Sequence, residues 1–241
     1  MTNLKHLCFD KDGVLIDVHR YWRHTTEIRT HYLTKRFKLS GEQKNRLISA
    51  MGINLSSGKI KKKGPIGYEP RVAIIDKVIS QLLTYSIKVT ALEIDVFFKE
   101  IDLYQQKNND YDVKLLEGVL EFLEEKKNKY IMTIFTSDRA TNAKMTLEKL
   151  GIAKFFTEIL GGDSINFPKP NPEGILQACF KVDKKVNQTA YISDTSSDLI
   201  MANDANVLKK IGVLSGLGTK KELTKTGDYV FENFFELGLS L

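Results

Sequence analysis

The sequence predicts an α/β fold in which a parallel sheet, with helices on both faces, is interrupted by an inserted all-helical domain. Three observations support this. Residues 113–241 alternate short β-prone runs with helical segments, a pattern typical of parallel sheets. Residues 18–112 contain helical segments and no convincing strand. A short apolar run at residues 7–9 supplies a strand before the insert. We therefore expect a core of residues 1–17 and 113–241 with a helical insert at 18–112.

The core elements follow one another with recognisable boundaries. Gly151 is a typical residue just beyond a helix end, and Pro172 stands where proline favours a helix start. In order, we expect a helix over 117–127, a strand over 130–135, a helix over 138–150, a strand over 158–160, a helix over 172–181, a strand over 189–193, a helix over 197–205 and a strand over 208–214.

The insert is expected to be helical and carries most of the positive charge. Its helices are predicted over 20–37, 41–51, 71–85 and 91–106, with a Gly/Ser/Lys/Pro loop at 52–70. The whole chain has a net charge of +6, and residues 18–112 hold 17 Lys and Arg against 10 Asp and Glu. Most of this excess is expected on solvated helix surface, and part of it can line a cleft for an anionic ligand.

Length and composition indicate a soluble globular protein. The 241 residues can bury a sizeable core, and no apolar run approaches the length of a membrane span. The N-terminus leads directly into a strand, so we expect no signal peptide. Cys8 and Cys179 lie in apolar contexts on separate elements. Buried free thiols fit a reducing cytoplasm, and we expect a cytoplasmic monomer or homodimer without a membrane partner.

The first strand ends in two carboxylates, Asp10 and Asp12, followed by Gly13. Side chains alternate faces along a strand, so Asp10 and Asp12 point the same way and Lys11 the other way if the extended geometry persists. Two close carboxylates repel each other, and a fold tolerates them when a metal cation or a proton-transfer role compensates. This peptide therefore predicts a site for a hard metal at the end of a strand.

The second predicted strand ends in Thr136-Ser137-Asp138. Ligands bind beyond the carboxyl ends of strands in open α/β sheets, and a hydroxyl with free amides at a helix N-terminus suits phosphate oxygens. The alternative is that one of the three residues is simply the helix cap. Both interpretations remain open at this point.

Two further strand ends carry suitable chemistry. Lys169 stands among three prolines at alternate positions, where a stiff backbone can hold it against a phosphate; a turn with a solvated lysine is the alternative. Asp194 ends the strand over 189–193, and Asp198 follows four residues later near a helix start. Asp198 could simply favour the helix dipole.

The order and spacing of these four strand ends resemble the haloacid dehalogenase-like hydrolase superfamily, in particular its phosphoglycolate phosphatase branch. The resemblance rests on Asp10-Lys11-Asp12-Gly13-Val14 for the first motif, DxDGT/V, on Thr136 for the second, on Lys169-Pro170 for the third, and on Ser193-Asp194 with Asp198 for the fourth. Residues 211–219 also look like that branch. The resemblance implies a Rossmann-like core and an α-helical cap at 18–112, which matches only in position and helical character.

The resemblance also implies roles for these residues. Asp10 would be the nucleophile that forms an aspartyl-phosphate, and Asp12 would protonate the leaving alcohol and then activate water. Thr136 and Lys169 would hold the phosphoryl oxygens, and Gly13 and Ser137 would contribute to substrate binding. These roles predict a phosphoric monoester hydrolase.

A metal cofactor follows from the same resemblance. Mg²⁺ would be held by Asp10, the backbone carbonyl of Asp12 and Asp194. Asp198 would act on the metal from further away, as a water-mediated partner. We therefore expect Mg²⁺ and a small phosphorylated metabolite, similar to phosphoglycolate or a sugar phosphate, as the ligands of this site.

Several alternatives remain open. A sugar-phosphate mutase uses the same Asp pair but retains the phosphoryl group, and a phosphonoacetaldehyde hydrolase-like enzyme would need a cap lysine that forms a Schiff base. A non-catalytic binding protein is disfavoured because all four motifs are intact. The lysines of residues 59–63 form one short basic run without aromatic interleaving, so no nucleic-acid partner is expected. This loop either contacts a second anionic group of the substrate or is simply solvated.

Overall fold

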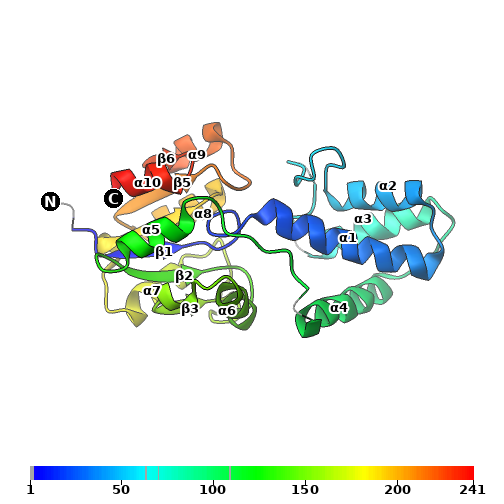
Figure 1. Cartoon of the computed structure of the whole chain (residues 1–241), viewed down its shortest axis with the longest axis horizontal. Coiled ribbons are helices and arrows are strands. Elements are labelled where there is room, and N and C mark those ends of the chain that lie inside the picture. The colour runs from blue at the N-terminus through cyan, green and yellow to red at the C-terminus, as the bar shows by residue number, and fades with distance from the viewer. Residues whose placement is uncertain (1–2, 63, 70, 109) are drawn as a thin grey trace. The chain divides into compact units, whose positions relative to one another are not determined.

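The computed structural model describes residues 3–62, 64–69, 71–108 and 110–241. The chain divides into two compact units, Met1–Asp17 with Val113–Leu241 and Val18–Asp112, which we call the core unit and the helical unit (Figure 1). Among the described residues, no helix combines the length and the apolar character that crossing a membrane requires.

The core unit is built on a six-stranded parallel sheet, which confirms the predicted α/β class. The strand order is β3-β2-β1-β4-β5-β6. The strands are β1 (His6–Phe9), β2 (Ile131–Phe135), β3 (Glu158–Leu160), β4 (Thr189–Ser193), β5 (Lys209–Val213) and β6 (Tyr229–Phe231). β1 lies between β2 and β4, and Cys8 pairs with Thr133 on one side and Tyr191 on the other. The carboxyl ends of these three strands therefore meet at one edge of the sheet.

Helices cover both faces of this sheet (Figure 1). They are α5 (Val119–Lys126), α6 (Ala140–Lys149), α7 (Glu173–Lys181), α8 (Ser196–Asp204), α9 (Lys220–Thr226) and α10 (Phe234–Ser240), with short 3₁₀ helices η1 (Ala153–Phe155) and η2 (Val186–Gln188). Leu7 and Phe9 of β1 pack into a buried cluster with residues of α5, α6 and α10. Cys8 points to the opposite face and packs with residues of α7 and α8. This alternation buries β1 on both sides.

The helical unit contains α1 (Val18–Phe37), α2 (Gly41–Met51), α3 (Arg71–Leu83) and α4 (Ala91–Asn108). α2 begins with a capping box, in which Ser40 and Gln43 each accept a hydrogen bond from the other's backbone N–H. Asp102 of α4 accepts hydrogen bonds from Arg29 of α1, at 2.8 Å, and from Arg71 of α3, at 2.6 Å. One carboxylate therefore joins three helices.

The chain leaves the core unit and returns to it through two paired segments. Ile16 and Leu115 form an isolated antiparallel bridge. The amide of Asp17 donates to the carbonyl of Lys114 at 3.0 Å, and that of Leu116 donates to the carbonyl of Leu15 at 3.0 Å. The outgoing and returning segments are thus hydrogen-bonded to each other before the helical unit begins.

Candidate active site

Asp10 and Lys169 meet at the carboxyl edge of the sheet. Asp10 follows β1, and its backbone amide donates to the carbonyl of Ile192 in β4 at 2.9 Å. Its Oδ1 accepts a hydrogen bond from Lys169 Nζ at 2.9 Å. The same ammonium donates to Asp198 Oδ2 at 2.7 Å, and the Lys169 side chain is only 8% exposed. The structure therefore excludes a solvated lysine at the third motif.

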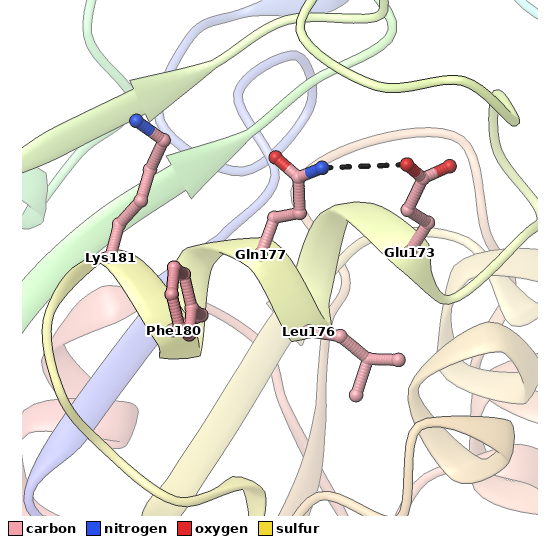
Figure 2. A pocket seen from close by; sticks show the side chains of 5 residues that line it. All are labelled: Glu173, Leu176, Gln177, Phe180 and Lys181. Atoms are coloured by element: carbon pink, nitrogen blue, oxygen red, sulfur yellow. Dashed lines mark hydrogen bonds between the residues drawn. The ribbon is translucent and has the colours of Figure 1, made fainter.

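The loop that carries Lys169 is fixed by Glu173, the first residue of α7. The Glu173 carboxylate accepts hydrogen bonds from the backbone amides of Asn166, at 3.1 Å, and Phe167, at 2.7 Å. Gln177 donates to the same carboxylate from one turn further along α7, in a shallow surface pocket along this helix (Figure 2). Sequence reasoning missed Glu173, although a carboxylate in the first helical turn after the loop was a signal for this role.

Asp198 is the anchor on the other side of Lys169. Its Oδ2 also accepts from Ser193 Oγ at 3.1 Å and from the Tyr191 hydroxyl at 3.3 Å. Its backbone amide donates to Thr195 Oγ1, the N-cap of α8. These contacts hold Asp198 beside the lysine, and its suggested water-mediated contact with a metal remains a prediction.

Asp194 is held by a tight loop that follows β5. Its Oδ2 accepts from the amide of Leu217 at 2.8 Å, while its Oδ1 is buried and has no hydrogen-bond partner within the described chain. A Cβ atom at Gly13 or Gly216 would overlap the Asp194 carboxylate. Ser215 Oγ donates to the carbonyl of Gly13 at 2.7 Å and so joins this loop to the first motif. Gly13 thus allows the close approach of Asp194.

The buried charges of this site do not balance. The Lys169 ammonium pairs with Asp10 and Asp198, and Asp194 lies near these two carboxylates. Three carboxylates and one ammonium leave two negative charges uncompensated when all four groups are ionised. Burial raises the pKa of Asp10 to about 6, although Lys169 lowers the value. Burial and the nearby Asp10 raise the pKa of Asp194 well above its usual range. Burial alone would lower the pKa of Lys169, but Asp10 and Asp198 raise it above the usual value.

The donor set suits a divalent hard cation. The orphaned Oδ1 of Asp194 and the excess negative charge both call for a positive ligand, and carboxylate oxygens are preferred by Mg²⁺. Among the described residues, no group of three or more His, Cys, Asp or Glu side chains is arranged to hold a metal. A set of two carboxylates, Asp10 and Asp194, with the Asp12 carbonyl is smaller than such a group and is compatible with that finding.

Asp12 has a different environment from Asp10. β1 ends at Phe9, and the chain then turns, because the amides of Leu15 and Ile16 both donate to the carbonyl of Lys11. The extended geometry considered for residues 10–12 therefore does not persist. Lys11 is buried and donates to Asp12 Oδ1 at 2.9 Å, while the Asp12 side chain is 30% exposed.

The second motif is not a helix cap. Thr136 is buried, its amide donates to the carbonyl of Leu160, and its hydroxyl accepts from the amide of Asp138 at 3.2 Å. α6 begins two residues after Asp138, later than predicted, and the amide of Ala140 donates to Asp163 Oδ1 at 2.8 Å. Asp163, which sequence reasoning missed, therefore satisfies the helix start.

Ser137 lies directly after Thr136 and is exposed. A phosphate-binding role for Thr136 and Ser137 remains a prediction. Their place after β2, which pairs with β1, puts them at the same sheet edge as Asp10.

The first half of the basic loop in the helical unit is held by a short bridge and by one of its lysines. Ile53 and Ile60 form an antiparallel bridge. Lys61 Nζ donates to the carbonyl of Ser49 at 2.9 Å, whereas Lys59 and Lys62 are exposed. Lys63, the remaining lysine of this predicted contact, lies outside the described residues. Two of the four lysines thus project from this part of the helical unit.

Residues 7–213 match the family described as haloacid dehalogenase-like hydrolase, which is the family that the motifs resemble. A phosphoglycolate phosphatase of Haemophilus influenzae (strain 86-028NP) is 27% identical over 151 residues, which cover 62% of this chain and 67% of that protein. A protein of Dickeya dadantii (strain 3937) named "Probable phosphatase IndB" is 34% identical over 119 residues, which cover 49% of this chain and 51% of that protein. The chain thus spans about two thirds of the first relative and about half of the second.

A solved structure from Haemophilus somnus, described as a predicted phosphoglycolate phosphatase, superposes with a TM-score of 0.73 at 21% identity. The alignment covers 100% of both chains. At this level of identity the likeness shows the fold alone.

Proposed function

The chain belongs to the haloacid dehalogenase-like hydrolase family, and on this basis we propose that it is a Mg²⁺-dependent phosphatase of a small phosphorylated metabolite. One observation carries the proposal: the Asp10 carboxylate lies beside a buried ammonium and near Asp194, whose Oδ1 is orphaned. This arrangement supplies a nucleophile and positive charge for a phosphoryl group, and its carboxylates suit a divalent cation. The relatives named phosphoglycolate phosphatase support a small phosphorylated organic acid or sugar as the substrate class.

Asp10 and Asp12 have different roles in the proposed reaction, as nucleophile and as general acid and base. An Asp10 oxygen attacks phosphorus, the bond to the leaving alcohol breaks, and Asp12, which enters the cycle protonated, gives that alcohol its proton. Asp12 then takes a proton from water, and the hydroxyl attacks the aspartyl-phosphate and releases phosphate and Asp10. The partial exposure of Asp12 suits this exchange of protons with substrate and water.

Lys169 and the residues after β2 hold the phosphoryl oxygens. Lys169 faces Asp10 as a buried cation, so it stabilises both the anionic nucleophile and the charge that develops on phosphorus. The Thr136 hydroxyl and the Ser137 amide are proposed to bind the other oxygens. Gly13 leaves room for the Asp194 carboxylate, and its own contact with substrate is part of the proposal.

Mg²⁺ would be held by Asp10, the carbonyl of Asp12 and Asp194. When bound, it supplies the positive charge that offsets the two excess carboxylates and the phosphate. Asp198 remains the partner of Lys169, and the Leu217 amide binds one oxygen of Asp194, so the other would be available to the cation.

A panel of phosphorylated metabolites with Mg²⁺ tests the proposal, with released phosphate measured for the wild type and for Asp10→Asn. We expect release from at least one member and a loss of at least about 10³-fold in Asp10→Asn, because the nucleophile is removed. No release from any member by the wild type contradicts the hydrolase proposal. Conversion of a sugar phosphate into its isomer without phosphate release would instead identify a mutase.

A further inference from the structure

A second buried lysine lies next to the candidate site. The Lys11 side chain is only 4% exposed, and its ammonium donates to Asp12 Oδ1 at 2.9 Å. The same nitrogen lies 3.4 Å from Asp138 Oδ2, on the loop between β2 and α6. A buried ammonium is costly unless it is paired, and here two carboxylates from different loops pair with it.

Asp138 is itself firmly held. Its Oδ1 accepts from the amide of Arg139 at 2.8 Å and from Asn142 Nδ2 at 3.3 Å. Its backbone carbonyl accepts from the amide of Gly162 at 2.8 Å. Lys11 therefore links Asp12 to a fixed point of the loop that also carries Thr136.

The two carboxylates of the first motif thus have separate lysines. Lys169 bridges Asp10 and Asp198, and Lys11 bridges Asp12 and Asp138. The Asp12 side chain is 30% exposed, whereas that of Asp10 is 13% exposed, so Asp12 has fewer neighbours that restrict its rotation. The hydrogen bond from the buried Lys11 ammonium can hold the Asp12 side chain in one orientation.

We propose that Lys11 is a positioning residue that orients the Asp12 carboxylate for proton transfer to the leaving group. This proposal rests on the phosphatase function proposed above. Lys11 does not touch substrate in this scheme, and it acts through Asp12 alone. A misplaced general acid loses much of its effect, because proton transfer needs the donor within hydrogen-bond distance of the departing oxygen.

The role predicts a loss that depends on the leaving group. An alkyl alcohol departs poorly without a proton, whereas p-nitrophenol departs readily as an anion. In Lys11→Met, which keeps the length of the side chain but removes its charge, we expect kcat/KM to fall by about 10²-fold for the best alkyl phosphate of the panel. For p-nitrophenyl phosphate we expect kcat/KM to fall by less than about 5-fold. The parameter kcat/KM reports the steps up to the departure of the leaving group, and p-nitrophenolate needs no proton to depart.

Three further variants complete the experiment. Lys11→Arg retains the donor and should recover part of the alkyl phosphate activity. Asp138→Asn weakens the anchor while leaving Lys11 in place, so it should show the same selective loss at smaller size. Lys127→Met removes an exposed lysine that follows α5 and pairs with Glu124 of that helix, and it should match the wild type on both substrates.

Equal losses on both substrates in Lys11→Met and Asp138→Asn would overturn the inference, because a purely structural role affects every substrate alike. Wild-type values for both variants would also overturn it. If the wild type releases phosphate from neither substrate class, the proposed phosphatase function fails and the inference with it. Circular dichroism and thermal melts of each variant establish that the folded proteins are compared.

Discussion

At the scale of single residues, the position of each carboxylate decides what it can do. Asp10, Asp194 and Asp198 are buried near one ammonium, so their charges call for a cation. Asp12 lies outside this group, is partly exposed and bonds to Lys11. One short peptide therefore supplies both a nucleophile, whose anionic form Lys169 favours against the effect of burial, and a carboxylate that can exchange protons.

A buried histidine gives stability a dependence on pH. His6 of β1 is fully buried, with Nδ1 at 3.0 Å from Thr189 Oγ1 and Nε2 at 2.8 Å from Thr133 Oγ1. Burial, with a contribution from Lys184, lowers its pKa from 6.5 to about 4. The unfolded state then binds more protons than the native state between these values, so His6 destabilises the fold as pH falls through this range.

We expect this effect to reach about 2 kcal/mol between pH 7 and pH 5. The free energy of unfolding in urea, measured at both values, should change by about that much less in His6→Gln than in the wild type. His31→Gln, at an exposed position, is the matched control and should keep the wild-type difference. If His6→Gln shows the same difference as the wild type, His6 binds protons equally in the native and unfolded states, and the prediction is wrong.

The sequence predicted which residues belong to the candidate site better than it predicted their hydrogen-bond partners. Asp10, Lys169 and Asp194 could be found because each ends a strand or stands in a stiff loop. Glu173 was missed although its place in the first turn of α7 was a signal, and Asp163 could not be found, since its bond to the start of α6 depends on how separate segments pack. Local pattern identifies a side chain, whereas only the tertiary fold identifies what it touches.

At the scale of elements, the loop after β5 controls the candidate metal ligand. Gly216 and Gly218 leave room for Asp194, and the Leu217 amide between them holds one carboxylate oxygen. The second oxygen, buried and orphaned, is thereby left for a cation. The loop has no side chain in the proposed chemistry and still determines which Asp194 oxygen is available.

Gly216→Ala tests this role. The added methyl group would overlap the Asp194 carboxylate, so we expect Mg²⁺ affinity to fall at least about 10-fold, or about 1.4 kcal/mol. Calorimetric titration with Mg²⁺ measures the affinity without any substrate. Gly41→Ala is the control, because a Cβ atom there meets nothing within 4 Å. An unchanged affinity in folded Gly216→Ala would contradict the role of the loop.

Element boundaries followed the sequence except where tertiary contacts moved them. β3 and β4 lie where the pattern predicted them. β6 was missed, since a three-residue edge strand carries too little pattern to be recognised. α6 starts two residues late, and Asp163 satisfies the amide of Ala140 at its start, while the Asp138 carboxylate is paired with Lys11.

At the scale of the whole molecule, the positive charge is concentrated in one unit. Residues 18–112 hold 17 Lys and Arg against 10 Asp and Glu, whereas the remaining residues hold 19 against 20. We therefore expect the anionic substrate proposed above to be attracted more by the charge of the helical unit than by that of the core unit. Such attraction between exposed charges weakens as salt screens them.

We expect KM for the best substrate to rise about 3- to 10-fold between 50 and 500 mM NaCl at constant Mg²⁺, with a smaller change in kcat. Lys59→Ala/Lys62→Ala, which removes two exposed charges from the helical unit, should reduce this dependence. Lys144→Ala/Lys221→Ala removes the same charge from the core unit and should retain it. Equal behaviour of the two double variants would contradict a role for the helical unit in attracting the substrate.

The paired segments at residues 15–17 and 114–116 have a consequence for how such a chain can change. Their mutual hydrogen bonds close the core unit before the helical unit begins, so the sheet does not depend on what is inserted between them. An insert of another length or architecture can be grafted at this junction without a new break in the sheet, because the two attachment points already lie together. The same junction would let evolution, or an engineer, exchange the inserted unit while the reacting groups of the core unit stay in place.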